Sequence, residues 1–172
     1  MRHSILACVG VAALLLLSGC AGYQLGPTNG LVAGARSVQI TPFANKTLQP
    51  RLSDYVMNSL RKNLQRDGTY RLDTHDEGDI VLTGEIVDYH RSGLSYVPND
   101  VITVLDYEIF MTAKISARER ATGRVIFSER AVTGHTALRA GNDLPSAERQ
   151  AAPVLADELA KKAIDLLVDG TW

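Results

Sequence analysis

Residues 105–118 read Leu-Asp-Tyr-Glu-Ile-Phe-Met-Thr-Ala-Lys-Ile-Ser-Ala-Arg, the longest regular alternation in this 172-residue chain. Apolar side chains occupy the odd positions, and mostly polar ones occupy the even positions. A period of two places these sets on opposite faces of a strand, one buried and one facing water, as in antiparallel sheets. Ala121-Thr122-Gly123 follows as a turn, and residues 125–134 return as the partner strand. The stretch predicts a half-buried antiparallel hairpin.

Two segments have the 3.6-residue periodicity of amphipathic helices. The first runs from Pro50 to Gly68, a residue suited to a left-handed cap, with the apolar face Leu52, Tyr55, Val56, Leu60 and Leu64. The second runs from about Ser146 to Asp169, with the apolar stripe Leu155, Leu159, Ala163 and Leu166. Pro153 lies inside the second segment, so it either kinks that helix or marks its true start.

Three shorter strands are expected, at 38–41, 70–74 and 80–87. Gly84 in the last of them indicates a bulge or a close backbone approach. Residues 43–47 and 90–100 read as loops, the latter an exposed connection. The order is β-α-β-β-β-β-α. We therefore expect an α+β fold, with two helices packed on one face of a four- to five-stranded, mainly antiparallel sheet.

The N-terminus reads as a targeting segment. Ile5 to Leu17 is a 13-residue apolar run, shorter than the ~20 residues needed to cross a bilayer but typical of a signal peptide. Leu17-Ser18-Gly19-Cys20 then matches the lipobox of bacterial lipoproteins, in which the thiol takes the lipid. An ordinary signal peptide with a chance cysteine is the alternative. We predict removal of residues 1–19 and modification of Cys20 with diacylglycerol and palmitate.

The domain boundaries follow from this processing. Residues 20–36 are rich in glycine, alanine and proline and form either a flexible tether or a partly ordered arm. Residues 37–172 form a single domain. The processed chain carries 17 basic and 19 acidic residues, which gives no electrostatic case for nucleic acid as a partner. With Cys8 removed and Cys20 lipidated, no thiol remains for a disulfide or a metal.

Catalytic and cofactor motifs are absent from the sequence. Neither a P-loop nor a Gly-x-Gly-x-x-Gly pattern occurs, and no Gly-x-Ser-x-Gly elbow surrounds a serine. His75, His90 and His135 survive processing without carboxylates at a motif spacing. A metal-dependent hydrolase built on these histidines is a minor alternative. We expect no enzyme activity, no cofactor and no metal site.

Basic residues gather near the turn of the long hairpin. They are Lys114, Arg118, Arg120, Arg124 and Arg130, with Glu119 and Glu129 among them. One interpretation is a solubilising sheet face. The other is a local cationic patch that meets phosphates or sugar acids on an otherwise near-neutral protein.

Several short motifs resemble one family. They are Gly22-Tyr23-Gln24-Leu25, Val38-x-Ile40-x-Pro42-Phe43-x-Asn45-x-Thr47, Pro50-Arg51-Leu52, Gly78-Asp79-Ile80-Val81-Leu82-x-Gly84-x-Ile86, Glu148-Arg149-Gln150-Ala151 and the terminal Trp172. Together with the lipobox they resemble LptE, the lipopolysaccharide-assembly lipoprotein family. The resemblance spans the whole processed chain.

The resemblance implies a non-catalytic role. Members sit at the inner leaflet of the outer membrane, plug the LptD β-barrel, help it assemble, and assist delivery of lipopolysaccharide to the outer leaflet. The implied fold, two helices on a four-stranded sheet, is similar to the one expected above. Because members contact lipopolysaccharide through basic residues on the sheet side, the patch residues Lys114, Arg118 and Arg124 become candidate contacts. Ala21, which is not Asp, agrees with outer-membrane sorting.

A second class of protein shares the opening motif: periplasm-facing lipoproteins that activate an enzyme of cell-wall synthesis. Reaching the cell wall from the outer membrane favours a long linker. The tether here has about 16 residues and spans at most ~55 Å when fully extended. A short tether favours a partner embedded in the same membrane.

Overall fold

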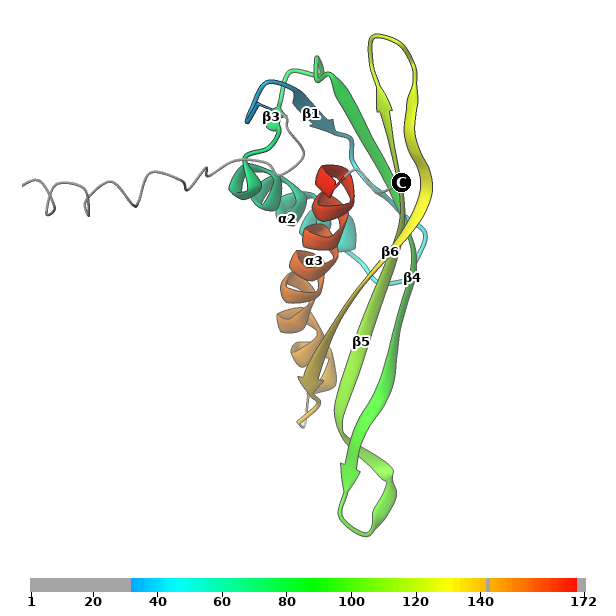
Figure 1. The fold of residues 1–172 in the computed structure, drawn as a ribbon. Helices are drawn as coiled ribbons and strands as arrows, with labels where there is room; N and C mark the ends of the chain where they lie inside the picture. The colour runs from blue at the N-terminus through cyan, green and yellow to red at the C-terminus, as the bar shows by residue number, and fades with distance from the viewer. Residues whose placement is uncertain (1–31, 142, 170–172) are drawn as a thin grey trace, which may run out of the picture.

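The computed structural model describes residues 32–141 and 143–169. The predicted signal peptide, Cys20, most of the predicted tether and Trp172 therefore lie outside the described residues. The elements are β1 (Ser37–Ile40), β2 (Ala44–Asn45), α2 (Leu52–Asp67), β3 (Arg71–Asp73), β4 (Ile80–Val97), β5 (Asp100–Glu119), β6 (Val125–Arg139) and α3 (Leu144–Asp169). Figure 1 shows the long β4, β5 and β6 as a twisted ribbon, with the two helices along one side.

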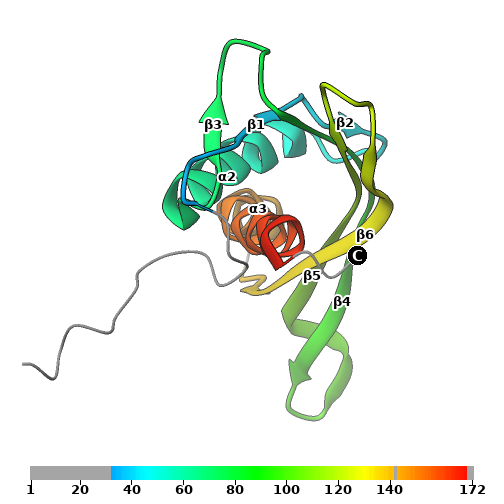
Figure 2. The same cartoon turned by 45° about the horizontal axis from the view of Figure 1, so that its top comes forward.

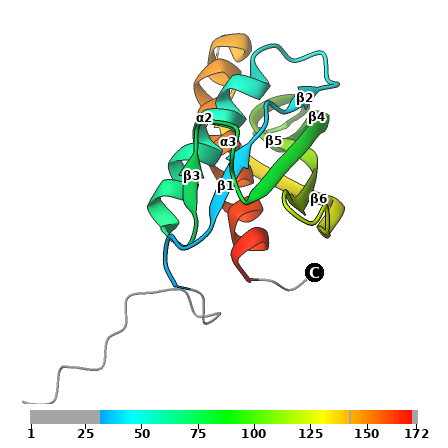
Figure 3. The same ribbon diagram turned by 90° about the horizontal axis from the view of Figure 1, so that it is seen from above.

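The fold class is confirmed as α+β, with a sheet that is larger and more mixed than expected. It has six strands in the order β3-β1-β4-β5-β6, and β2 pairs with β4 beside this path. β4, β5 and β6 are antiparallel, whereas β1 runs parallel to both β3 and β4. The parallel part arises because α2 connects β1 to β3 as a crossover, which brings the chain back in the same direction. Figure 3 shows β3 and β1 side by side next to α2.

The two helices cover the concave face of the sheet (Figure 2). The predicted apolar faces are the buried ones: Leu60 and Leu64 of α2 and Leu155 and Leu159 of α3 have no exposed surface. Gly134 of β6 allows α3 to come close, because a Cβ at this position would lie 2.8 Å from the Leu155 carbonyl oxygen. The core is therefore a two-layer contact of helices on sheet, as the period-two and period-3.6 patterns require.

Pro153 does not mark the start of the last helix. α3 begins nine residues earlier, at Leu144, and continues through Pro153 to Asp169. The helix therefore starts two residues before the expected Ser146. Pro153 itself is exposed, so its ring occupies the solvent side of α3. A proline here removes one backbone donor from the helix, and the packed face of α3 supports the helix across that gap.

Gly84 is the site of a close approach, as one of the two interpretations predicted. A Cβ added to Gly84 would lie 2.3 Å from the Phe43 ring, which is buried against β4. The bulge in β4 lies nearby, between Ile86 and Asp88. The glycine therefore makes room for the aromatic side chain that closes this end of the core.

The prediction of a loop at residues 90–100 is wrong. β4 continues to Val97 and β5 begins at Asp100, so only Pro98 and Asn99 connect them. Asn99 has a φ of 68°, as the second central residue of such a tight turn after proline requires. The strand was not evident in the sequence because this part of the hairpin is exposed on both faces, which removes the apolar alternation. Residues 43–47, also predicted as a loop, contain the two-residue strand β2.

Candidate functional site

The candidate binding residues Lys114 and Arg118 project from the outer face of β5, the face away from the helices. They alternate with Ala113, Ile115 and Ala117, which are buried under the helices. Lys114 Nζ lies 3.4 Å from Glu129 Oε2 on the neighbouring strand, and both side chains are well exposed. Arg118 is exposed and has no ion pair within the described part of the chain.

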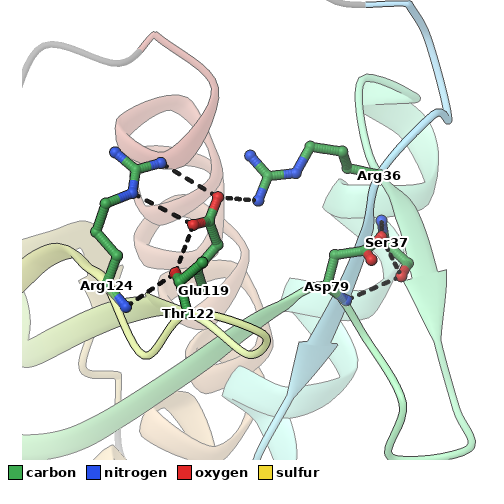
Figure 4. Close-up of polar contacts among 6 residues, drawn as sticks. All are labelled: Arg36, Ser37, Asp79, Glu119, Thr122 and Arg124. Carbon is green, nitrogen blue, oxygen red and sulfur yellow. Dashed lines mark hydrogen bonds and ion pairs between the residues drawn. The ribbon is translucent and has the colours of Figure 1, made fainter.

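Arg124, the third candidate, belongs to an ion-pair network at the β5–β6 turn (Figure 4). Its guanidinium donates to the two carboxylate oxygens of Glu119 at 3.2 and 3.3 Å. Arg36 donates to the same carboxylate at 2.7 Å, and the Thr122 hydroxyl donates at 2.8 Å. These bonds from Arg124, Thr122 and Arg36 lower the pKa of Glu119 to about 2. Arg124 is thus engaged in holding the turn.

The five basic residues near the turn do not form one surface. Arg120 donates to the Gly78 carbonyl and to the Gln39 side chain, so it ties the turn to β1 and to the connection before β4. Arg130 pairs in register with the inward-facing Ile115, which places it on the helix side of the sheet. The structure therefore brings Lys114 and Arg118 together on one face and separates them from the other three.

A second set of hydrogen bonds in Figure 4 joins Ser37 of β1 to Asp79, the residue before β4. The Ser37 backbone N–H and hydroxyl donate to one Asp79 carboxylate oxygen at 2.7 and 2.9 Å, and the Asp79 backbone N–H donates back to the Ser37 hydroxyl. The bonds from Ser37 hold the pKa of Asp79 below its ordinary value. With the Arg36–Glu119 bond, these hydrogen bonds fix the start of β1 at the end of the sheet that carries the β5–β6 turn.

The β4–β5 hairpin extends beyond the ends of β6 and α3 as an arm (Figure 1). We call residues 94–105 the arm tip. Its exposed apolar side chains are Leu94 at 54%, Tyr96 at 48% and Ile102 at 86%. Isolated two-stranded hairpins are marginally stable in water, and clustered exposed apolar side chains mark interaction sites. Because residues 90–100 were predicted as a loop, this exposed apolar hairpin was not evident from the sequence.

A groove of about 520 Å³ lies where β4 leaves β2, between the loop 46–49 and β4 residues 87–91. Arg91 crosses its inner side, donating to Glu148 at 2.8 Å and lying 5.8 Å from the centre of the Tyr107 ring. The Tyr89 hydroxyl at this groove is buried without a hydrogen-bond partner among the described residues. Burial, reinforced by the charge of Glu148, raises the pKa of Tyr89 to about 12.

The histidines do not assemble a metal site. His90 and His135 stack on either side of Phe110, with ring centroids 4.9 and 6.0 Å away. His90 lies 2.6 Å from Asp88, whereas His135 lies 2.9 Å from Glu108 and 3.3 Å from Glu158. Residues 32–141 and 143–169 contain no group of three or more histidine, cysteine or acidic side chains placed to hold a metal ion.

The same described residues contain no helix that is both long and apolar enough to span a bilayer. Contact with a membrane through Cys20 remains a prediction, since that residue lies outside the described part of the chain.

The family model described as LptE, lipopolysaccharide-assembly, matches residues 35–169. No curated protein sequence matches the chain significantly. Among solved structures, protein XCC0632 from Xanthomonas campestris is similar with a TM-score of 0.60 at 10% identity, covering 86% of this chain and 92% of that one. A minor lipoprotein from Acinetobacter baumannii has a TM-score of 0.53 at 15% identity, covering 78% and 93%. Protein CT253 from Chlamydia trachomatis has a TM-score of 0.57 at 11% identity, covering 79% and 96%.

At these identities the solved structures establish the shared fold alone. The family model covers most of the chain, including the β1 opening, the β4 glycine and the whole of α3. Its match is therefore the finding from which a function is inferred.

Proposed function

This chain belongs to the LptE lipopolysaccharide-assembly family, and from that membership we propose that it is a non-enzymatic outer-membrane lipoprotein that partners the LptD β-barrel. In this role it aids assembly of the barrel and delivery of lipopolysaccharide to the outer leaflet. We further propose that residues 1–19 are its signal peptide, that Cys20 carries the lipid, and that residues 20–36 tether the domain 37–172 to the periplasmic face of the membrane.

The observation that supports a membrane-embedded partner best is the arm. Its tip exposes Leu94, Tyr96 and Ile102 on a hairpin that no third strand or helix among the described residues covers. Burying an apolar side chain of this size contributes about 1.5–3 kcal/mol. The arm tip is thus built to be covered by another protein, and the inside of a wide barrel offers such cover.

The reach of the arm fits a partner in the same membrane as the anchor. The Arg36–Glu119 bond places the exit of the tether at one end of the sheet, and the Pro98-Asn99 turn lies at the other end. β5, with 20 residues, spans roughly 66 Å between them at ~3.3 Å per residue. The hydrocarbon core of a bilayer is ~30 Å thick. The sheet is therefore longer than the hydrocarbon core is thick, so a domain whose Arg36–Glu119 end lies at the inner leaflet is long enough for its arm tip to cross that core.

Lipopolysaccharide is proposed to contact the outer face of the sheet. Lys114 and Arg118 both point away from the helices there: Arg118 has no ion pair among the described residues, and Lys114 makes only an exposed 3.4 Å pair with Glu129, which solvent screens. Arg124, proposed from the sequence for the same role, is held by Glu119 and contributes less. The proposed contact surface is therefore centred on Lys114 and Arg118.

Affinity purification of the tagged, full-length lipoprotein from membranes tests the proposal. We expect a large outer-membrane β-barrel to copurify in stoichiometric amount, and purified lipopolysaccharide to bind the complex. Recovery of a penicillin-binding protein in place of a barrel would support activation of cell-wall synthesis and overturn the proposal. A variant with Cys20→Ser separates the anchor from the partner contact, because it loses lipidation while leaving the folded domain unchanged.

A further inference from the structure

One side of β4 is unpaired over much of its length. β5 pairs with β4 from Ile80 to Val97, while on the other side β1 takes Ile80–Leu82 and β2 takes Glu85–Ile86. From Asp88 onward no other strand of the described residues lies on that side. Figure 1 shows this part of β4 as the outer margin of the arm.

The direction of the backbone groups on this margin follows from the opposite edge of the sheet. On β6, the Thr133 carbonyl accepts a bond from Lys162 at 2.8 Å, and the His135 N–H donates to Glu158 at 2.9 Å. The backbone N–H and C=O groups of Thr133 and His135 therefore point away from β5. The N–H and C=O groups of successive residues in a strand point to opposite sides. Those of Gly134, which lies between the two, therefore point toward β5.

The same alternation carries across to β4. Gly134 is paired with Met111, so Met111 directs its backbone groups toward β6 and away from β4. Tyr89 is the β4 partner of Met111, and Arg91 is the partner of Ile109, two residues on. The N–H and C=O groups of Tyr89, Arg91 and, by the same step, Gly93 therefore point to the unpaired side. None of these groups has a hydrogen-bond partner within residues 32–141 and 143–169.

The two edges thus differ in whether their outward backbone groups have hydrogen-bond partners. On β6, Glu158 and Lys162 of α3 bond to the outward backbone groups, which protects that edge from pairing with another chain. On β4, no side chain caps the corresponding groups. Between the register shifts at Ile86/Asp88 and Gly93/Ser95, the segment Asp88–Gly93 pairs with β5 in unbroken register. Six regular residues are the length of an average strand.

The groove of about 520 Å³ opens beside the start of this edge. Leu48 and Val87 give it exposed apolar surface. The charged side chains that line it have partners: Lys46 lies 3.4 Å from Glu85, Arg91 pairs with Glu148 at 2.8 Å, and Asp88 is hydrogen-bonded to His90 at 2.6 Å. An incoming segment therefore meets a margin with open backbone groups, an apolar side pocket and little net charge, which suits an uncharged extended chain.

We propose that the edge Asp88–Gly93 pairs with an extended, uncharged segment of the barrel partner as an added strand. This strand would continue along β4 from the position where β2 ends. A row of unpaired N–H and C=O groups is matched only by another extended backbone. The row is available because the chain turns away after Lys46, whose N–H makes the last bond to Ile86 at 2.9 Å. This inference rests on the proposed partnership with a membrane barrel, and it names the mode of contact.

Amide hydrogen exchange on the full-length lipoprotein, alone and in its copurified barrel complex, tests this mode. We expect exchange at Tyr89, Arg91 and Gly93 to slow about tenfold or more in the complex, as one new hydrogen bond per residue predicts. The amides of His90 and Ser92, which face β5, serve as internal controls and change little. Unchanged exchange at the three outward amides in a complex that still forms would overturn strand addition and leave the proposed partnership intact.

A matched pair of variants tests the same edge in the intact protein. Arg91→Ala removes the ion pair with Glu148 but keeps the outward N–H, whereas Arg91→Pro also removes the N–H. We expect Arg91→Pro to reduce barrel recovery at least tenfold relative to Arg91→Ala, with the circular dichroism of both variants verifying the fold. Equal recovery from both variants contradicts the proposal. Failure of the wild-type protein to recover a barrel overturns the partnership and this inference with it. If the amides of Tyr89, Arg91 and Gly93 became protected from exchange at higher protein concentration without the barrel, the edge would instead pair with a second copy of this chain.

Discussion

The Arg36 guanidinium donates to the Glu119 carboxylate across 2.7 Å, although the two residues are 83 positions apart in the chain. Arg36 directly precedes β1, and Glu119 is the last residue of β5. The bond therefore joins the residue before β1 to the turn between β5 and β6. It also gives the domain a defined pH response.

Glu119→Gln should reduce stability near neutral pH and have little effect in acid. Folding lowers the pKa of Glu119 to about 2, whereas the unfolded chain has a value of ~4.3. The stabilisation from this carboxylate is therefore full above about pH 5 and is lost as the pH falls toward 2. Urea denaturation of wild type and variant between pH 2 and pH 7 measures the difference. Glu129→Gln, at an exposed pair with Lys114, is the control and should change stability little at any pH.

Gly84→Ala should destabilise the domain by about 1–3 kcal/mol, the range for overpacking a core. The new Cβ would lie 2.3 Å from the ring of the buried Phe43. The double variant Gly84→Ala with Phe43→Leu should be less destabilised than the sum of the single variants, since the smaller side chain relieves the clash. Additive free energies of unfolding, measured in urea, would show that the close approach is not the cause.

Pro153→Ala should stabilise the protein by up to about 3 kcal/mol, because it restores a backbone donor within α3 and removes a ring from the helix interior. Pro153 is exposed, so the change leaves the packed face intact. The neighbouring Val154→Ala alters helix propensity alone and should contribute only about 0.5 kcal/mol. A melting temperature for Pro153→Ala at or below that of wild type would indicate that the proline is required by the packing of α3.

Replacing Lys114 and Arg118 by glutamate should weaken lipopolysaccharide binding about tenfold or more, as loss of charged hydrogen bonds to phosphate predicts. Arg124→Gln should weaken it much less, because Glu119 already engages that guanidinium. Surface-binding measurements on immobilised lipopolysaccharide compare the variants. If the triple change of Lys114, Arg118 and Arg124 to glutamate left binding intact, the outer sheet face would be excluded as the contact surface.

The triple variant Leu94→Ser, Tyr96→Ser and Ile102→Ser should reduce recovery of the barrel about tenfold or more. Its melting temperature should stay nearly unchanged. These side chains are exposed in the free domain, so they stabilise a complex and not the fold. Val154→Ser removes a comparably exposed apolar side chain, at 58%, from α3 outside the arm, and should leave recovery unaffected. Equal losses from both changes would point to a general effect of surface polarity on expression or solubility.

Much of this molecule was predictable from local patterns. The alternation from Leu105 to Ala117 predicted β5, the spacing of Leu52 to Leu64 predicted α2, and Gly84 predicted the approach of another group to the backbone. These features are readable because half-buried elements repeat their apolar residues with the period of the backbone. The motifs that resemble LptE also led to the family that the match over residues 35–169 establishes.

Other features depend on the tertiary structure. Residues 90–100 were predicted as a loop because a hairpin that is exposed on both faces carries no apolar alternation. Its two strands, from β4 and β5, are held by their pairing with each other. The parallel placement of β3 beside β1, and the bond from Arg36 to Glu119, join residues far apart in the chain. Local sequence determined which segments fold as strands and helices wherever one face is buried. Long-range pairing decided which charges are neutralised and which strand edge is left open.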